Sequence, residues 1–149
     1  MRGQKMRLYK CPVCDTVVDV LEECGLEIVC CGPAMKLLSE NCADDNAGSH
    51  RAVVKWTADG LTVSIGDPLH PCKADHYIAW IEAVVGRKCY RQFLGPSQSP
   101  RVTFHIPREK VTVRAYCTVH GLWSLTAAGA PSSAGACDHP HGNVLRQAV

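Results

Sequence analysis

Four histidines and one cysteine have the types and spacing of a single metal centre. His70 and His76 form an HPx4H pattern, Cys117 and His120 share a CxxHG turn, and His50 precedes an apolar run. Imidazole suits iron, copper, nickel and zinc, and one thiolate among imidazoles tunes electron density at a redox-active metal. A structural zinc site would normally stop at four ligands. The set therefore predicts an iron redox centre, although spacing alone leaves ordinary structural histidines as an even alternative.

Four further cysteines have metal-site spacing near the N-terminus: Cys11, Cys14, Cys30 and Cys31. A CxxC pair directs two thiolates at one metal, and a second pair completes a tetrahedron. Adjacent side chains point apart in extended backbone, so the CysCys step needs a turn, which the following Gly-Pro suits. Domains below about 40 residues usually need a metal or disulfides to fold. We interpret this set as an iron tetrathiolate that passes single electrons, with structural zinc as the main alternative and disulfides as the lesser one.

Composition narrows the class of protein. Ten cysteines in 149 residues fall just under the level of a disulfide scaffold. The opening MRGQKMRLYK has no apolar run after it, so we expect no signal peptide, and no stretch is long enough to span a bilayer. We therefore expect a cytoplasmic protein, because CxxC pairs in a reducing compartment more often bind metal. A net charge of +2 gives no reason to expect a nucleic acid or a membrane as partner.

The region from residue 50 to residue 125 follows a pattern of short strands. Turn signals at 59–60, 66–67, 86–87 and 95–96 separate the apolar runs AVVKWT, LTVSI, HYIAWIEAVV, KCYRQFL, RVTFHI and KVTVRAYC. Such spacing predicts a β-sandwich. HYIAWIEAVV could also form a helix, but its β-branched and aromatic residues favour a strand. Alternation in VTVRAYC places Val111, Val113, Ala115 and Cys117 on the core face, opposite Arg114 and Tyr116.

We therefore expect a mainly β protein with two domains. Residues 1–38 form a small metal domain with the β runs VVDVL and LEIVC, and the polar residues 39–49 form a linker. Residues 50–125 form the β-sandwich, and residues 126–149, rich in Ala, Gly, Ser and Pro, form a flexible tail.

Four segments carry a resemblance to a known family. YKCPVC, LEIVCCGPAMKLL, HPCKADHYIAWIE and AYCTVHGLW, in this order, resemble the desulfoferrodoxins, which are two-domain superoxide reductases. The resemblance covers about residues 8–125 and implies a desulforedoxin-like (rubredoxin-type) domain followed by an immunoglobulin-like β-sandwich. It implies two mononuclear iron centres: one held by Cys11, Cys14, Cys30 and Cys31, and a catalytic one with His50, His70, His76 and His120 equatorial and Cys117 axial.

The resemblance also implies an activity and partners. Superoxide would receive one electron and two protons at the position opposite Cys117, giving hydrogen peroxide without release of dioxygen. The implied partners are superoxide, a rubredoxin-like electron donor and a second copy of the chain in a homodimer. The alternatives are a non-catalytic iron- or zinc-binding electron-transfer protein that has lost turnover, and a superoxide dismutase.

The segment before His50 departs from the family pattern. Family members commonly have Glu-Lys before this histidine and a proline two residues after it, whereas this chain has AGSHRA. Gly48 and Ser49 cannot supply those charges. Lys73, between two ligands, and Arg51 are candidate substitutes, with an ordinary solvated charge as the favoured alternative for both. Our hypothesis is that Lys73 provides the local positive field.

The other cysteines and histidines have no pattern that assigns them a role. Cys72, beside a ligand, fits a buried small residue better than an oxidisable thiol. A cluster in the expected tail could bind stray metal but is more often incidental: Cys137, His139 and His141. Cys24 is interpreted as a spare thiol and His105 as a structural residue, whereas Cys42 and Cys89 carry no pattern.

Overall fold

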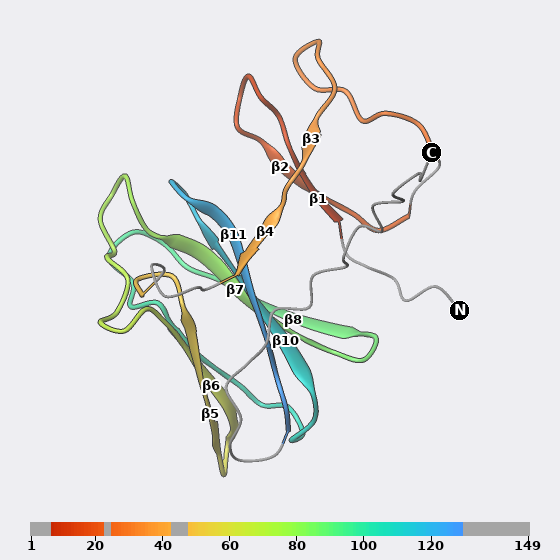
Figure 1. Cartoon of the computed structure of the whole chain (residues 1–149). Coiled ribbons are helices and arrows are strands. Elements are labelled where there is room, and N and C mark those ends of the chain that lie inside the picture. Colours follow the sequence, from red (N-terminus) through yellow and green to blue (C-terminus); the bar gives the residue numbers. More distant parts are fainter. Residues whose placement is uncertain (1–6, 23–24, 43–47, 130–149) are drawn as a thin grey trace, which may run out of the picture.

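The computed structural model describes residues 7–22, 25–42 and 48–129, and all regular secondary structure in these ranges is β-strand (Figure 1). The prediction of a mainly β protein is therefore confirmed. Among these residues, no helix has the length and apolar character that a membrane crossing requires. Cys24 and the cluster of Cys137, His139 and His141 lie outside the described residues.

The N-terminal part forms a small antiparallel sheet in the order β2-β1-β3, with β1 (Arg7–Lys10) between β2 (Val17–Val20) and β3 (Lys36–Leu37). The expected run VVDVL forms β2. The expected run LEIVC does not form a strand and contributes only an isolated bridge between Val29 and Ala34. The chain turns there instead, because Cys31 and Gly32 both have positive φ, 54° and 104°.

Two sheets form the sandwich. The larger has the order β4-β11-β10-β7-β8, from β4 (Glu40–Cys42), β7 (Ile78–Val85), β8 (Lys88–Phe93), β10 (Val111–Cys117) and β11 (Gly121–Ala127). The smaller has the order β5-β6-β9, from β5 (Ala52–Thr57), β6 (Gly60–Ile65) and β9 (Arg101–Phe104). All six runs expected as strands form strands, including β7, for which a helix was the alternative. Strand β11 was not predicted from the sequence.

The stretch expected as a linker, 39–49, contains a strand of the sandwich. β4 runs parallel to β11, with Glu40 opposite Leu122 and Cys42 opposite Ser124. The short polar sequence of β4 has no hydrophobic alternation that would predict a strand. It is a strand because it forms hydrogen bonds with the edge of β11. The expected tail likewise begins within β11, and its residues from 130 onward lie outside the described residues. The predicted domain boundaries themselves stay a prediction.

The core of the sandwich lies between the inner faces of the two sheets. β6 contributes Leu61, Val63 and Ile65, each with 0% of its surface exposed, and the inner face of β10 packs against them. Full burial of each such side chain stabilises the fold by about 1.5–3 kcal/mol. Cys117 is the last residue of β10 on this face and is also 0% exposed. The expected core-side placement of Cys117 is confirmed, so the core leads directly to a candidate ligand.

The outer face of the larger sheet is covered by the small sheet. Leu8 of β1 packs against Trp80, Tyr116 and Leu122, and all four side chains are buried. The rings of Trp80 and Tyr116 stack with their centroids 5.9 Å apart. Tyr116 therefore lies opposite the core, as the alternation predicts, yet it is not exposed. We call this contact between the small sheet and the larger sheet the seam.

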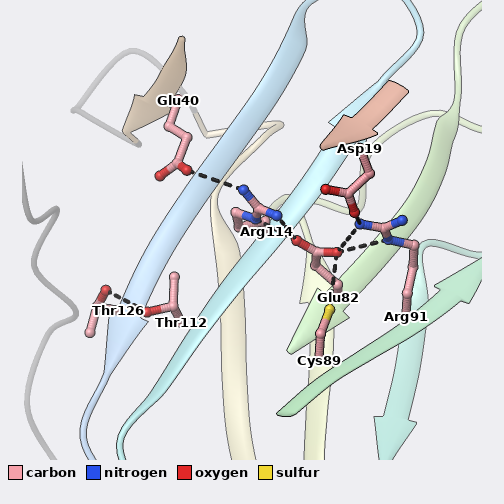
Figure 2. Close-up of polar contacts among 8 residues, drawn as sticks. All are labelled: Asp19, Glu40, Glu82, Cys89, Arg91, Thr112, Arg114 and Thr126. Carbon is pink, nitrogen blue, oxygen red and sulfur yellow. Dashed lines mark hydrogen bonds and ion pairs between the residues drawn. The ribbon is translucent and has the colours of Figure 1, made fainter. Parts of the chain in front are cut away.

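A buried ion-pair network crosses the seam (Figure 2). Glu82, 0% exposed, pairs with the guanidinium groups of Arg114 and Arg91. Arg91 Nη2 also lies 2.7 Å from a carboxylate oxygen of Asp19 on β2, and Arg114 Nη1 lies 3.3 Å from one of Glu40 on β4. Because a buried carboxylate is unfavourable unless it is paired, the two arginines compensate for the burial of Glu82. The network thereby ties β2 of the small sheet and the edge strand β4 to the central strands of the larger sheet.

Replacing Glu82 by alanine leaves Arg114 buried without its main counter-ion. Removal of one partner of a buried pair costs about 3–5 kcal/mol. We expect Glu82→Ala to lower the free energy of unfolding by that amount, measured by urea denaturation at fixed metal content. The control is Thr126→Ala, which removes the neutral cross-strand contact with Thr112 (3.2 Å) on the same sheet and should lose less than about 1 kcal/mol. Equal losses in the two variants would contradict this role of the network.

Candidate metal centres

The first candidate centre brings together all five residues predicted to share a metal: His50, His70, His76, Cys117 and His120. Their possible ligand atoms all lie within 4.8 Å of one another. The Nε2 atoms of His50 and His70 are 3.2 Å apart, and Cys117 Sγ lies 3.5 Å from His70 Nε2 and 3.6 Å from His120 Nδ1. Ligands about 2.0–2.3 Å from one metal and at right angles to each other are about 3 Å apart. The five atoms therefore fit one coordination sphere.

Two of the five ligands come from β10 and the turn that follows it. Cys117 ends β10, and the backbone N–H of His120 donates to its sulfur over 3.4 Å. That hydrogen bond places the imidazole of His120 beside the thiolate, as CxxC cysteines are placed beside each other. The CxxHG spacing thus brings two of the five ligands, Cys117 and His120, together.

Two other ligands are fixed by loop backbone. His70 follows β6, and its N–H donates to the carbonyl of Ile65 over 2.8 Å. His76 precedes β7 and exchanges two backbone hydrogen bonds with Lys73, of 3.0 and 3.2 Å. His76 Nε2 is buried and has no hydrogen-bond partner among the described residues. A buried nitrogen without a partner is unfavourable unless something binds it, which fits a metal ligand.

Gly66 allows the segments of His50 and His70 to approach each other. Gly66 has a φ of +87°, and a Cβ at this position would lie 2.6 Å from both Ser49 O and His70 N. Its N–H donates to the carbonyl of Arg51 over 2.8 Å. No side chain fits between the two ligand segments. In the sequence, Gly66 was recognised only as part of a turn, and no signal there linked it to the metal ligands.

Two histidines of this centre, His50 and His70, are held in their neutral form. Burial, followed by the other three imidazoles, lowers the pKa of His50 to about 4, and burial lowers the pKa of His70 as well. Only a neutral imidazole has a free lone pair for a metal. At neutral pH these two side chains therefore bind a metal without first losing a proton.

The second candidate centre brings together the four cysteines predicted for the small domain, Cys11, Cys14, Cys30 and Cys31. Cys30 Sγ lies 3.7 Å from Cys14 Sγ and 3.8 Å from Cys31 Sγ. Four thiolates at about 2.3 Å from a metal in a tetrahedron are about 3.8 Å apart. The sulfurs thus already have the spacing of a tetrahedral iron or zinc site, and the turn expected at the CysCys step is confirmed by the positive φ of Cys31.

The cysteine sulfurs of this centre differ in their hydrogen bonds, and those of Cys14 and Cys30 also differ in their pKa values. The backbone N–H groups of Val13 and Cys14 point at Cys11 Sγ over 3.4 and 3.5 Å. The hydroxyl of Thr16 lies 3.1 Å from Cys14 Sγ, and its hydrogen bond is the main reason that the pKa of Cys14 falls to about 6. The neighbouring thiols, Cys14 first, raise the pKa of Cys30 to about 12. Cys14 is therefore available to a metal as a thiolate at a lower pH than Cys30, and the contribution of Thr16 was missed from the sequence.

The structure also shows the exposure and contacts of other residues that the sequence analysis singled out. Lys73 and Arg51 are exposed beside ligands. Cys72, expected to be buried, is exposed, because its side chain lies on the loop between two ligands and outside the core. His105, expected to be structural, has its Nδ1 2.8 Å from the carbonyl oxygen of Asp59. The S–H of Cys89 points at the Glu82 carboxylate over 3.4 Å.

The comparisons with known proteins agree with this site. Residues 44–126 match the family described as desulfoferrodoxin, and residues 3–38 match the desulfoferrodoxin N-terminal domain. The desulfoferrodoxin of Syntrophotalea carbinolica is 41% identical over 122 residues, which cover 82% of this chain and 97% of that protein. That of Nitratidesulfovibrio vulgaris is 40% identical over 120 residues, covering 80% of this chain and 95% of the relative. A two-sheet β-sandwich with a four-cysteine unit thus defines the class, and the chain belongs to the desulfoferrodoxin family.

A solved structure shows the same fold. The superoxide reductase from Treponema pallidum superposes with a TM-score of 0.67 at 22% sequence identity, covering 82% of this chain and 98% of that one. The expected fold, a small metal unit followed by a β-sandwich, is confirmed. The family and the two donor sets together identify both sites as the iron sites of a desulfoferrodoxin, as expected.

Exchanging Gly66 for alanine should separate the two ligand segments. We expect Gly66→Ala to weaken Co(II) binding at the five-ligand centre at least tenfold, as a displaced ligand would, and to leave the four-cysteine centre unchanged. Titration followed by the separate d–d and thiolate charge-transfer bands distinguishes the two centres. The control is Gly86→Ala, with φ +58° and no atom within 4 Å of the place that a Cβ would take, which strains the backbone without crowding the site. A normal five-ligand centre in Gly66→Ala would contradict this role.

Proposed function

We propose that the chain is a superoxide reductase. Superoxide takes up one electron and two protons to give hydrogen peroxide at an iron held by His50, His70, His76, His120 and Cys117. The observation that carries the proposal is the presence of four imidazoles and one thiolate within one coordination sphere in a member of this family. A relative from Pyrococcus abyssi that is named superoxide reductase is 30% identical over 93 residues, which cover 50% of this chain and 81% of that protein.

The ligand residues contribute to this reaction through their charge, their burial and their hydrogen bonds. The four imidazole ligands carry no negative charge, so the thiolate of Cys117 is the one anionic ligand that repels a small anion. Cys117, 0% exposed, provides a thiolate shielded from water, and the N–H of His120 donates to it. Hydrogen bonding and burial of such a sulfur set the redox potential of its metal. An iron held by these five residues would supply the transferred electron.

The approach of superoxide and protons depends on charge outside the ligand set. Lys73 lies within the loop that connects His70 to His76, and Arg51 directly follows His50. Both side chains are exposed, which lets them attract an anion but weakens each interaction through solvent. Lys73 is proposed to provide the main positive field, because the backbone hydrogen bonds with His76 hold it beside the centre.

The four-cysteine centre is proposed to hold a second iron and to accept electrons from a small rubredoxin-like donor. Val13 and Val29, 63% and 60% exposed, stand next to Cys14 and Cys30 in sequence. Apolar side chains around an accessible redox site fit the transient docking of a small carrier protein. Assembly as a homodimer, a cytoplasmic location and a role in protection against oxidative stress are part of the same proposal.

The reaction itself is tested by its products. Chemically reduced, iron-loaded protein should form one hydrogen peroxide for each superoxide that it consumes, with no dioxygen released. A calibrated source sets the amount of superoxide supplied, and an oxygen electrode measures any dioxygen released. His120→Ala, which lacks a ligand, should abolish the consumption while keeping the absorption of the four-cysteine centre. Release of one dioxygen for every two superoxides would identify a dismutase, and no consumption would support the non-catalytic alternative.

The role of Lys73 is tested by rate and salt. We expect Lys73→Ala to lower the second-order rate with superoxide about two- to fivefold, since one exposed charge contributes about 1 kcal/mol or less, and to flatten its dependence on ionic strength. Pulse radiolysis measures both. Lys110→Ala, an exposed lysine before the opposite end of β10, serves as the control for net charge. If the two variants behave alike, Lys73 has no special part.

A further inference from the structure

One ligand of the five-ligand centre, His50, comes from the turn that precedes β5. Backbone hydrogen bonds hold its neighbours: the carbonyls of Gly48 and Arg51 accept from Asp67 and Gly66 over 3.0 and 2.8 Å. These bonds place the main chain but leave the imidazole free to rotate about its own side-chain bonds. The orientation of the His50 ring must therefore be set by side chains.

Besides the other ligands, Ser49 and Trp123 contact the His50 ring from different directions. The hydroxyl oxygen of Ser49 lies 3.1 Å from His50 Nδ1. The indole of Trp123 stacks on the ring with the centroids 4.5 Å apart and the planes inclined by 10°. His50 is 8% exposed, so its ring is shielded from water, whereas Ser49 is exposed and its hydroxyl reaches the ring from the surface.

These contacts distinguish the two ring nitrogens. His50 Nε2 faces the other ligands, 3.2 Å from His70 Nε2, whereas Nδ1 faces Ser49. When Nε2 binds a metal, Nδ1 has to carry the proton, and Ser49 Oγ is placed to accept it in a hydrogen bond. Such a bond to the outer nitrogen of a ligating histidine fixes the tautomer and the direction of the lone pair.

Trp123 is a rigid platform for the stacking. It lies on β11 between two paired strands, opposite Ala115 of β10 and Asn41 of β4. Asn41 also donates from Nδ2 to the carbonyl oxygen of His120 over 3.4 Å. The pairing of β4 with β11 thus supports both the platform and a second ligand. Side chains on paired strands hold a site more firmly than side chains on loops.

We propose that Ser49 and Trp123 are positioning residues that hold the tautomer and the ring plane of His50 at the five-ligand centre. The proposal goes beyond superoxide reduction and rests on the proposed function only in assuming that this centre binds a metal. It also gives Ser49 a role at the position where family members commonly have a lysine: here the residue orients a ligand and contributes no charge.

The Ser49 contact is tested with the full chain loaded with Zn(II), a diamagnetic probe. NMR should show a slowly exchanging His50 Nδ1–H in the natural sequence, and Ser49→Ala should lose this protection. Ser49→Thr, which keeps the hydroxyl, should retain it. Co(II) affinity of the five-ligand centre should fall about 10–100-fold in Ser49→Ala and be restored in Ser49→Thr.

The Trp123 contact is tested on the same zinc-loaded chain. The ring protons of His50 should be shifted upfield by the indole, and this shift should vanish in Trp123→Ala and persist in part in Trp123→Phe. Co(II) affinity should follow the same order, with a loss of about tenfold or more in Trp123→Ala. Trp56→Phe, on β5, is the matched tryptophan control and should change neither readout.

Unchanged Nδ1–H exchange and unchanged Co(II) affinity in Ser49→Ala and Trp123→Ala would overturn the proposal. So would a loss of affinity that neither Ser49→Thr nor Trp123→Phe rescues, because that pattern indicates general packing. None of these readouts uses superoxide. Failure of the proposed reaction in the natural sequence is therefore distinguishable from failure of the positioning role.

Discussion

The structure depends on the convergence of five donor atoms from separate segments at one end of the β-sandwich. One thiolate comes from a strand, and the imidazoles come from loops that must approach within a few ångströms of each other. Three features bring the five donor atoms together. Gly66 has no side chain to separate the segments, backbone hydrogen bonds fix His70 and His76, and the N–H of His120 donates to Cys117 Sγ. The sandwich acts as the rigid frame for these loops.

The larger sheet connects this frame to the second centre. One face of β10 closes the core with Cys117, and the other presents Tyr116 and Arg114 to the seam. Consecutive residues of one strand thus serve the metal centre and the contact with the small sheet. Because Arg91 reaches Asp19 and packs 4.8 Å over the ring of Trp80, polar and apolar contacts act together in holding the small sheet in place. The two centres are therefore parts of one connected structure.

Local patterns allowed much of this arrangement to be predicted. Alternation in VTVRAYC correctly placed Cys117 toward the core, and CxxC with the CysCys turn correctly grouped four sulfurs. The features that escaped prediction depend on contacts between distant segments. β4 is a strand only because β11 offers it an edge, and Gly66 matters only because Ser49 and His70 lie on either side. Neither has a signature in its own neighbourhood of the sequence.

The central claim is that His50, His70, His76, Cys117 and His120 hold one iron. Anomalous diffraction from crystals of the protein as purified from iron-replete cells, recorded on both sides of the iron absorption edge, tests it most directly. Two iron peaks per chain are expected, one among the four cysteine sulfurs and one bonded to the four imidazoles and Cys117 Sγ. A zinc signal at the five-ligand centre, or an iron there that lacks Cys117 or any of the four histidines, would contradict it.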